Sequence, residues 1–224
     1  MKQKMPLRAA LYVVGMVLLA LGLVLNTKTG LGTSPLVSIA NCIAQLSALS
    51  FSNATFLMYC LFVVIEILLH LLRRRRILAT LDILQLPFSL VFTRFMGLFD
   101  ARIPDLAIDC LGSVWGTVWV RLALLLVAIL LIGLGACLMV NMRLIPNPGD
   151  GCVLAIVDYT QKKIGSVKNF FDIVNVFIAC LIGLIAKGEL LGVGVGTVLA
   201  MLGVGRVMAF FSSRFSSLFQ KLEP

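Results

Sequence analysis

Six long apolar stretches constrain the fold of this chain more than any other feature. A helix needs about 20 apolar residues to cross a bilayer, and lipid forces every spanning segment to satisfy its own backbone hydrogen bonds. Only 13% of the residues are charged, against about 25% in a soluble domain. The sequence therefore predicts an all-α polytopic membrane protein with spans at residues 8–25, 54–72, 77–98, 114–140, 169–186 and 189–211.

Two further apolar stretches, 35–48 and 151–163, are short, and each follows a polar break rich in Gly and Pro. The breaks run from Asn26 to Pro35 and from Asn141 to Gly151. Apolar segments of 10–14 residues are more often re-entrant or buried helices than spans. We therefore predict six transmembrane helices plus two short re-entrant or half helices. The alternative is eight spans arranged as parallel repeats.

The positive charges favour the first arrangement, because Lys and Arg accumulate on the cytoplasmic side. If neither short segment crosses, thirteen Lys and Arg lie inside and three outside, whereas the counts are nine and seven if both cross. We therefore expect a multi-pass protein of the cell (cytoplasmic) membrane with both termini in the cytoplasm. The thirteen are Lys2, Lys4, Arg8, Arg73, Arg74, Arg75, Arg76, Arg143, Lys162, Lys163, Lys168, Arg214 and Lys221.

The order of span, break with short helix, span and span occurs twice, at about 8–99 and 114–212, within a single predicted membrane domain of residues 1–224. The last helix of each half carries an arginine, Arg94 or Arg206. An odd number of spans per half makes the two halves inverted repeats. Paired breaks in inverted repeats are typical of the binding sites of secondary transporters. We therefore predict a substrate site at Gly32, Thr33, Ser34, Pro35, Asn147, Gly149, Asp150, Gly151, Arg94 and Arg206.

The starts of the short helices have both a functional and a structural interpretation. With Thr33 or Ser34 as N-cap and Pro35 as first residue, a helix start inside the membrane would direct its free N–H groups at an anion. The same residues also suit a well-capped buried helix without a ligand. Asp150 either caps the second short helix or carries a proton or cation.

Acidic residues within the apolar segments are the candidates for ion coupling: Glu66, Asp82, Asp150 and Asp172. Pro87 is expected to free the carbonyl of Ile83, which would complete a proton or sodium site with Asp82. Alternatively, Asp82 pairs with Arg94 or the arginine cluster. Arg94 and Arg206 either pair with Asp82, Asp150 or Asp172, bind a substrate anion, or reach the membrane interface. Glu66 with His70 and Lys168 with Asp172 have the i,i+4 spacing of proton relays or of local contacts.

Other chemistry is not predicted. The six cysteines show no zinc or disulfide spacing, and no nucleophile lies near a base, so we expect no metal site, no cofactor and no enzyme activity. The basic residues lie at helix ends, which gives no reason to expect nucleic acid.

Several motifs resemble the uncharacterised bacterial YczE/YyaS/YitT-type membrane proteins: Leu31 to Pro35, Leu84 to Ser89, Pro148 to Gly151, Lys168 to Asp172, and Gly196-Thr197. Two positions depart from that pattern. Leu36-Val37 stands where Trp-Asp is frequent, and Asp150 where Glu is common. The resemblance implies a polytopic membrane protein but brings no settled activity.

These observations predict transport or binding of a small solute, preferably an anion, where the two breaks meet, coupled to H⁺ or Na⁺. The alternatives are a membrane partner for a cytoplasmic enzyme and a substrate-binding subunit of a multi-component importer. The expected partners are the lipid bilayer, an unidentified solute and, as one option, a second copy of the chain in a homodimer.

Overall fold

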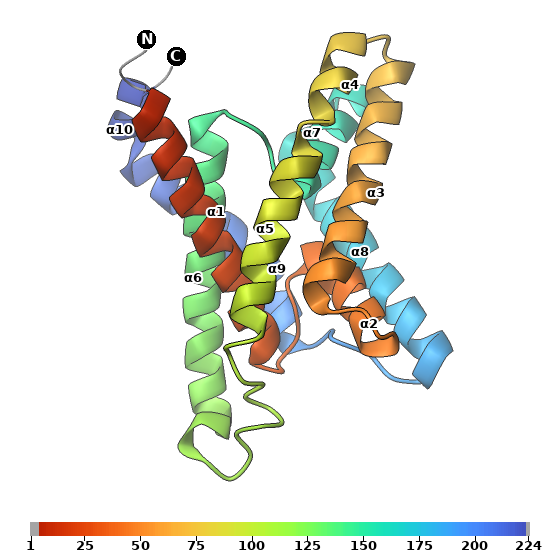
Figure 1. Ribbon diagram of the computed structural model, residues 1–224, viewed down its shortest axis with the longest axis vertical. Coiled ribbons are helices and arrows are strands. Elements are labelled where there is room, and N and C mark those ends of the chain that lie inside the picture. The colour runs from red at the N-terminus through yellow and green to blue at the C-terminus, as the bar shows by residue number, and fades with distance from the viewer. Residues whose placement is uncertain (1–4, 223–224) are drawn as a thin grey trace. The chain divides into compact units, whose positions relative to one another are not determined.

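The computed structural model describes residues 5–222, and these form helices joined by connections that are short except for the long loop between Asp100 and Val118 (Figure 1). Within that range six segments are long and apolar enough to cross a membrane, which confirms the all-α class and the six predicted spans. Lys2 and Lys4 lie outside the described residues, as does the side chain of Lys221. The segments are α1 (Met5–Lys28), α3 (Phe51–Leu72), α4 with α5 (Arg76–Asp82 and Gln85–Asp100), α6 (Val118–Met142), α8 (Ile164–Lys187) and α9 (Val195–Arg214).

The first short helix starts differently from the prediction. A 3-10 turn, η2 (Pro35–Val37), precedes α2 (Ser38–Leu46), whose N-cap is Val37 without a side-chain hydrogen bond. The Ser38 hydroxyl donates to the Pro35 carbonyl at 2.9 Å and so closes the turn. Capping of α2 by Thr33 or Ser34 is therefore wrong, because the turn shifts the start of the α-helix past both residues.

The second short helix, α7 (Pro148–Thr160), begins with Pro148 as its first residue and Asn147 as N-cap. Proline suits this position, since its missing N–H has no partner within the helix anyway. Two further elements, η3 (Val114–Gly116) and α10 (Ser216–Leu222), were not indicated by the sequence.

The chain forms two compact units, and each takes segments from both predicted repeats. Unit 1 comprises Met1–Ser34, Leu98–Leu144 and Gly194–Pro224, and so holds α1, α6 and α9. Unit 2 comprises Pro35–Gly97 and Ile145–Val193, and holds both short helices with α3, α4, α8 and most of α5.

Glycines allow very close helix packing in unit 1, where α1 and α6 run side by side in opposite directions (Figure 1). A Cβ atom on Gly135 would lie 2.6 Å from the carbonyl oxygen of Gly15. A Cβ atom on Gly133 would likewise overlap the side chain of Val207 on α9. Small residues of this kind let helix backbones approach in lipid, where dispersion rather than the hydrophobic effect holds helices together.

The first break is fixed within unit 1 by hydrogen bonds to its backbone. Arg121 donates from Nε to the Thr29 carbonyl at 2.6 Å, and the Gly196 N–H donates to the Leu31 carbonyl at 2.7 Å. Gly32 has a φ of +124°, and a Cβ there would lie 2.6 Å from the Thr197 hydroxyl. The break therefore packs directly on the first turn of α9.

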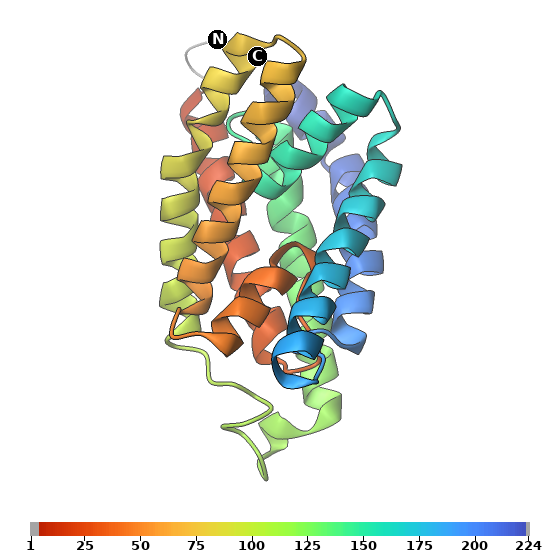
Figure 2. The ribbon, with the colours of Figure 1, turned by 90° about the vertical axis from the view of Figure 1, so that its right-hand side faces the viewer.

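In unit 2, the short helices share their neighbours: α2 and α7 each pack against both α3 and α8 (Figure 2). Aromatic rings fill the space between the longer helices. The Tyr59 ring stacks on Phe92 at 5.8 Å, and Phe62 lies 5.2 Å from Phe171. All four of these rings are buried.

Candidate functional site

The starts of the two short helices meet in unit 2. The Leu36 side chain, from η2, lies so close to Gly149 of α7 that a Cβ atom on this glycine would overlap it. The parts of the two breaks that belong to unit 2 therefore end at one place. Gly32, Thr33 and Ser34 are buried in unit 1, whereas Pro35, Asn147, Gly149 and Gly151 are buried in unit 2.

An amide and a phenol stand at the start of α7. Asn147 is 7% exposed, and its Nδ2 group donates to the hydroxyl of the fully buried Tyr59 at 3.4 Å. This geometry is at the long limit of a hydrogen bond. The Asn147 Oδ1 atom is buried and has no hydrogen-bond partner among the described residues. An unpaired amide oxygen in an apolar unit marks a position where a donor group would be stabilised.

Asp150, Lys168 and Asp172 form an ion-pair group that we call the lysine cluster. The Lys168 Nζ atom lies 3.2 Å from Asp150 Oδ1 and 3.9 Å from Asp172 Oδ1. The two aspartates come from the first turn of α7 and from α8, which also carries Lys168. Lys168 keeps 38% of its side chain exposed and Asp172 only 11%. Two carboxylates thus share one cation.

Glu66, His70, Asp82 and Gln85 form a second group, which we call the α3–α5 cluster. All four side chains are buried, with residue exposures between 1% and 8%. His70 Nδ1 and Asp82 Oδ2 lie 2.7 Å apart. The expected pairing of Asp82 with Arg94 or the arginine cluster is therefore wrong, because His70 reaches it across the α3–α4 connection.

The third span is interrupted at Ile83–Leu84, between Asp82 and Gln85. Pro87 cannot donate to the Ile83 carbonyl, but the Leu86 N–H does so at 3.1 Å. The tighter i,i+3 bond thus satisfies the oxygen that the sequence predicted to be free.

Gly151 connects the second cluster to α7. A Cβ atom built on it would lie 2.6 and 2.8 Å from the two Glu66 carboxylate oxygens and 3.0 Å from Gln85 Oε1. Only a residue without a side chain leaves room for these oxygens. Since Asp150 precedes Gly151, the first turn of α7 contacts both clusters.

The two predicted substrate arginines lie outside both clusters. Arg94 is exposed on α5 of unit 2, and Arg206 is exposed on α9 of unit 1. The predicted pairing of Arg94 is wrong, because no ion pair of the described residues joins it to Asp82, Asp150 or Asp172, whereas the pairing of Arg206 stays a prediction. An exposed arginine can extend its guanidinium to the membrane interface.

Four residues of the clusters and their surroundings were not among the predicted site residues: Tyr59, His70, Gln85 and Lys168. The i,i+4 spacings of Glu66 with His70 and of Lys168 with Asp172 were the available signals for two of them. Gln85 stood out only as a polar residue near Pro87, and no pattern singled out Tyr59.

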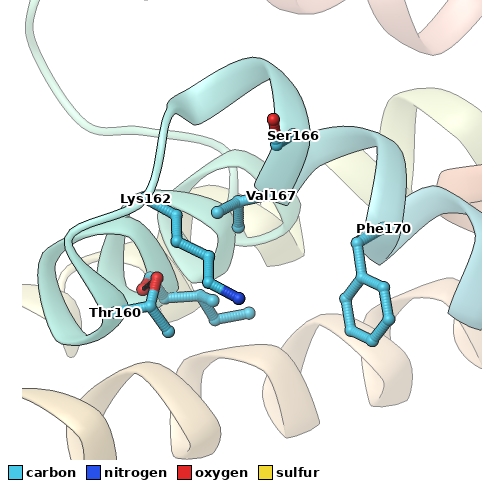
Figure 3. A pocket seen from close by; sticks show the side chains of 6 residues that line it. Thr160, Lys162, Ser166, Val167 and Phe170 are labelled. Atoms are coloured by element: carbon cyan, nitrogen blue, oxygen red, sulfur yellow. Dashed lines mark hydrogen bonds between the residues drawn. The ribbon is translucent and has the colours of Figure 1, made fainter.

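A pocket of about 250 Å³ lies where α7 ends and α8 begins (Figure 3). In Figure 3 the Lys162 side chain extends into the space between Thr160 and Phe170. None of the predicted site residues lines it, and its lining is otherwise Ile156, Ser166 and Val167.

The apolar helices define a multi-pass membrane protein, and the buried acidic side chains of the described residues, Glu66, Asp82 and Asp172, all lie in unit 2 together with the buried His70. Residues 6–213 match a family described as a family of unknown function, DUF6198, and the chain belongs to this family. This agrees with the uncharacterised family predicted from the motifs, while the YczE/YyaS/YitT name itself stays a prediction. No curated protein and no solved structure matches the chain.

Proposed function

We propose that the protein binds and transports a small polar solute at the meeting point of η2 and α7, with coupling to H⁺ or Na⁺. The supporting observation is the lysine cluster: three charged side chains gather at the start of a short helix inside an apolar unit. Charges in membrane-embedded segments are costly and usually mark the path of a substrate or ion.

The inverted arrangement of the two halves is part of this proposal. Its support is the shared packing of α2 and α7, each of which contacts both α3 and α8. If α2 corresponds to α7 and α3 to α8, each short helix packs on the span of its own half and on that of the other. Re-entrant helices arranged in this way are found around transporter binding sites.

The lysine cluster suggests how an anion and a proton would be coupled. The two carboxylates compensate the positive charge of the Lys168 amino group, so this charge does not attract an anionic solute. Protonation of Asp150, the closer of the two carboxylates, would release that group to bind an anionic solute, while the total charge of the site stays the same. Transport of an anion together with a proton follows from this exchange. Na⁺ in place of the proton is the other form of the coupling.

Uptake into proteoliposomes tests the proposal. The purified chain would be given carboxylates, phosphate, amino acids and neutral sugars, each with and without an inward proton or sodium gradient. We expect one class to be accumulated, and we expect Asp150→Asn to remove the dependence on the gradient. Glu189→Gln, which changes an exposed residue, is the matched control and should behave like the unaltered chain. Failure to bind or move any class would contradict the proposal, as would gradient-dependent uptake by Asp150→Asn.

Docking of a cytoplasmic enzyme is the alternative, through the loops at Arg73–Arg76 and Lys162–Lys168. Arg73 already donates to the Tyr159 carbonyl at 2.8 Å, and Arg75 pairs with Asp158 at 3.0 Å. These contacts occupy part of the surface that a partner would need. We therefore favour transport over docking or catalysis. Co-purification of an enzyme, or of an ATPase as an importer requires, would reverse that preference.

A further inference from the structure

The α3–α5 cluster has the composition of a metal site, although the sequence led us to expect none. One ligand atom each from Glu66, His70 and Asp82 lie within 4.8 Å of one another, and all three residues are buried. Ligand atoms around a tetrahedral zinc ion are about 3.4 Å apart, given bonds of about 2.1 Å. His70 Nδ1 and Asp82 Oδ2 are closer than this, at 2.7 Å. The largest separation allowed among the three ligand atoms, 4.8 Å, is greater than this.

A fourth side chain supports a ligand independently of these three. Gln85 is 1% exposed, and its Oε1 atom has no hydrogen-bond partner among the described residues. Glu66 Oε2 is also buried and unpaired there. Both oxygens lie within 3.0 Å of the same point above Gly151. Two unpaired oxygens that converge in this way are stabilised by a cation between or beside them.

The charges of the cluster also require compensation. Among the side chains that the structure describes, no lysine or arginine lies within ion-pair distance of Glu66 or Asp82. His70 offers at most one positive charge to two carboxylates. Buried carboxylates without a partner are strongly unfavourable, so this cluster needs one or two further positive charges. A divalent cation supplies both at once.

We propose that unit 2 binds a divalent transition-metal cation, with Zn²⁺ as the probe, through Glu66, His70, Asp82 and Gln85. One imidazole nitrogen with carboxylate and amide oxygens is a donor set that suits this group of metals. The site goes beyond the proposed transport function, which rests on the lysine cluster. It assigns Glu66 and Asp82 to a bound metal rather than to a coupling ion.

Zinc binding by the metal-stripped full-length chain in nanodiscs tests this assignment by equilibrium dialysis with metal analysis. We expect one Zn²⁺ per chain, with an affinity at least about tenfold weaker in His70→Gln and in Glu66→Gln, because losing even an outer partner of a metal site costs about 10–100-fold. Glu189→Gln, an exposed Glu→Gln change, should bind as the unaltered chain does. Equal binding by all variants would indicate adventitious binding to the free cysteines and would overturn the proposal.

A second measurement uses the unaltered chain and so does not depend on how the variants fold. His70 is the only histidine in the sequence, so chemical modification of histidine by diethyl pyrocarbonate reports on this residue alone. We expect Zn²⁺ to slow the modification and Mg²⁺ not to do so. Modification at the same rate with and without Zn²⁺ would overturn the proposal and would assign the cluster to protons. Solute uptake by Asp150→Asn is unaffected by this result, so the two proposals can fail separately.

Discussion

Units 1 and 2 bury different kinds of side chain, although both are built from apolar helices. In unit 1, the contacts between α1, α6 and α9 are made by glycine backbone and aliphatic side chains such as Leu125 and Ile129. In unit 2, the interior also contains the buried α3–α5 cluster, whereas the lysine cluster is partly exposed, as is the ion pair of Lys28 with Asp100 in unit 1. Close packing of helices therefore stabilises unit 1, whereas unit 2 also contains buried carboxylates, whose burial is unfavourable.

This difference indicates where function lies. Fit alone requires only small and branched residues, and these are sufficient to hold helices together in lipid. Buried charges give little net stability, even when they are paired. Their presence in unit 2 is explained by chemistry that the unit carries out, and unit 1 is the scaffold.

The largest effect is expected from Gly135→Leu in unit 1, because the new side chain would run into the Gly15 backbone. We expect the free energy of unfolding in micelles to fall by about 3 kcal/mol. The control is Gly205→Leu on α9, where no atom lies within 4 Å of the added Cβ. It should change stability by less than about 0.5 kcal/mol. Equal losses of stability at the two glycines would show that the close packing of Gly135 on Gly15 does not stabilise unit 1.

A smaller effect is expected from Lys168→Met in unit 2, which leaves two aspartates without their cation. We expect a loss of about 1.5 kcal/mol, less than for a fully buried pair because the lysine side chain is 38% exposed. The loss should shrink at acidic pH, where the aspartates are protonated in both proteins, and chemical denaturation at several pH values measures this. A loss that stays constant with pH would assign the effect to packing of the lysine stem.

Tyr59→Phe should cost about 1 kcal/mol or less, because it removes a long hydrogen bond from Asn147 and leaves that amide unpaired. Tyr159→Phe removes a hydroxyl from a residue that is 47% exposed and serves as the control. Thermal unfolding of the two variants would compare them directly. If Tyr59→Phe were as stable as the control, the hydroxyl would contribute nothing to the start of α7.

Effects on stability as small as that of Tyr59→Phe, within about 1 kcal/mol, are expected from Gly149→Ala and Gly151→Ala. The added methyl groups meet the ends of flexible side chains, Leu36 in one case and Glu66 with Gln85 in the other. Function should separate the two variants. Gly151→Ala should weaken zinc binding at least about tenfold, and Gly149→Ala should lower solute uptake. The same change in both activities for both variants would mean that the clusters form one site.

The sequence was sufficient to predict the helices, because the length of an apolar stretch determines whether it can cross a bilayer. The spacing of Lys168 and Asp172 also indicated a contact that the structure shows at 3.9 Å, but most other partners could not be predicted. The spacing of Glu66 and His70 indicates a contact within α3, yet His70 bonds Asp82, twelve residues away on the next helix. The partners of Arg94 and the cap of α2 were also wrong, since tertiary packing and a 3-10 turn decide them. The division into two units had no local signal at all.

The composition of the two units has a consequence for biosynthesis. The chain passes from one unit to the other after Ser34, Gly97, Leu144 and Val193. Unit 2 therefore lacks α7 until residue 160 and α8 until residue 187 have been made, and unit 1 lacks α9 for longer still. The α3–α5 cluster is complete within residues 66–85, so His70 can partner Asp82 as soon as α3 and α4 have been made, whereas Glu66 and Gln85 wait for Gly151 of α7 to cover them.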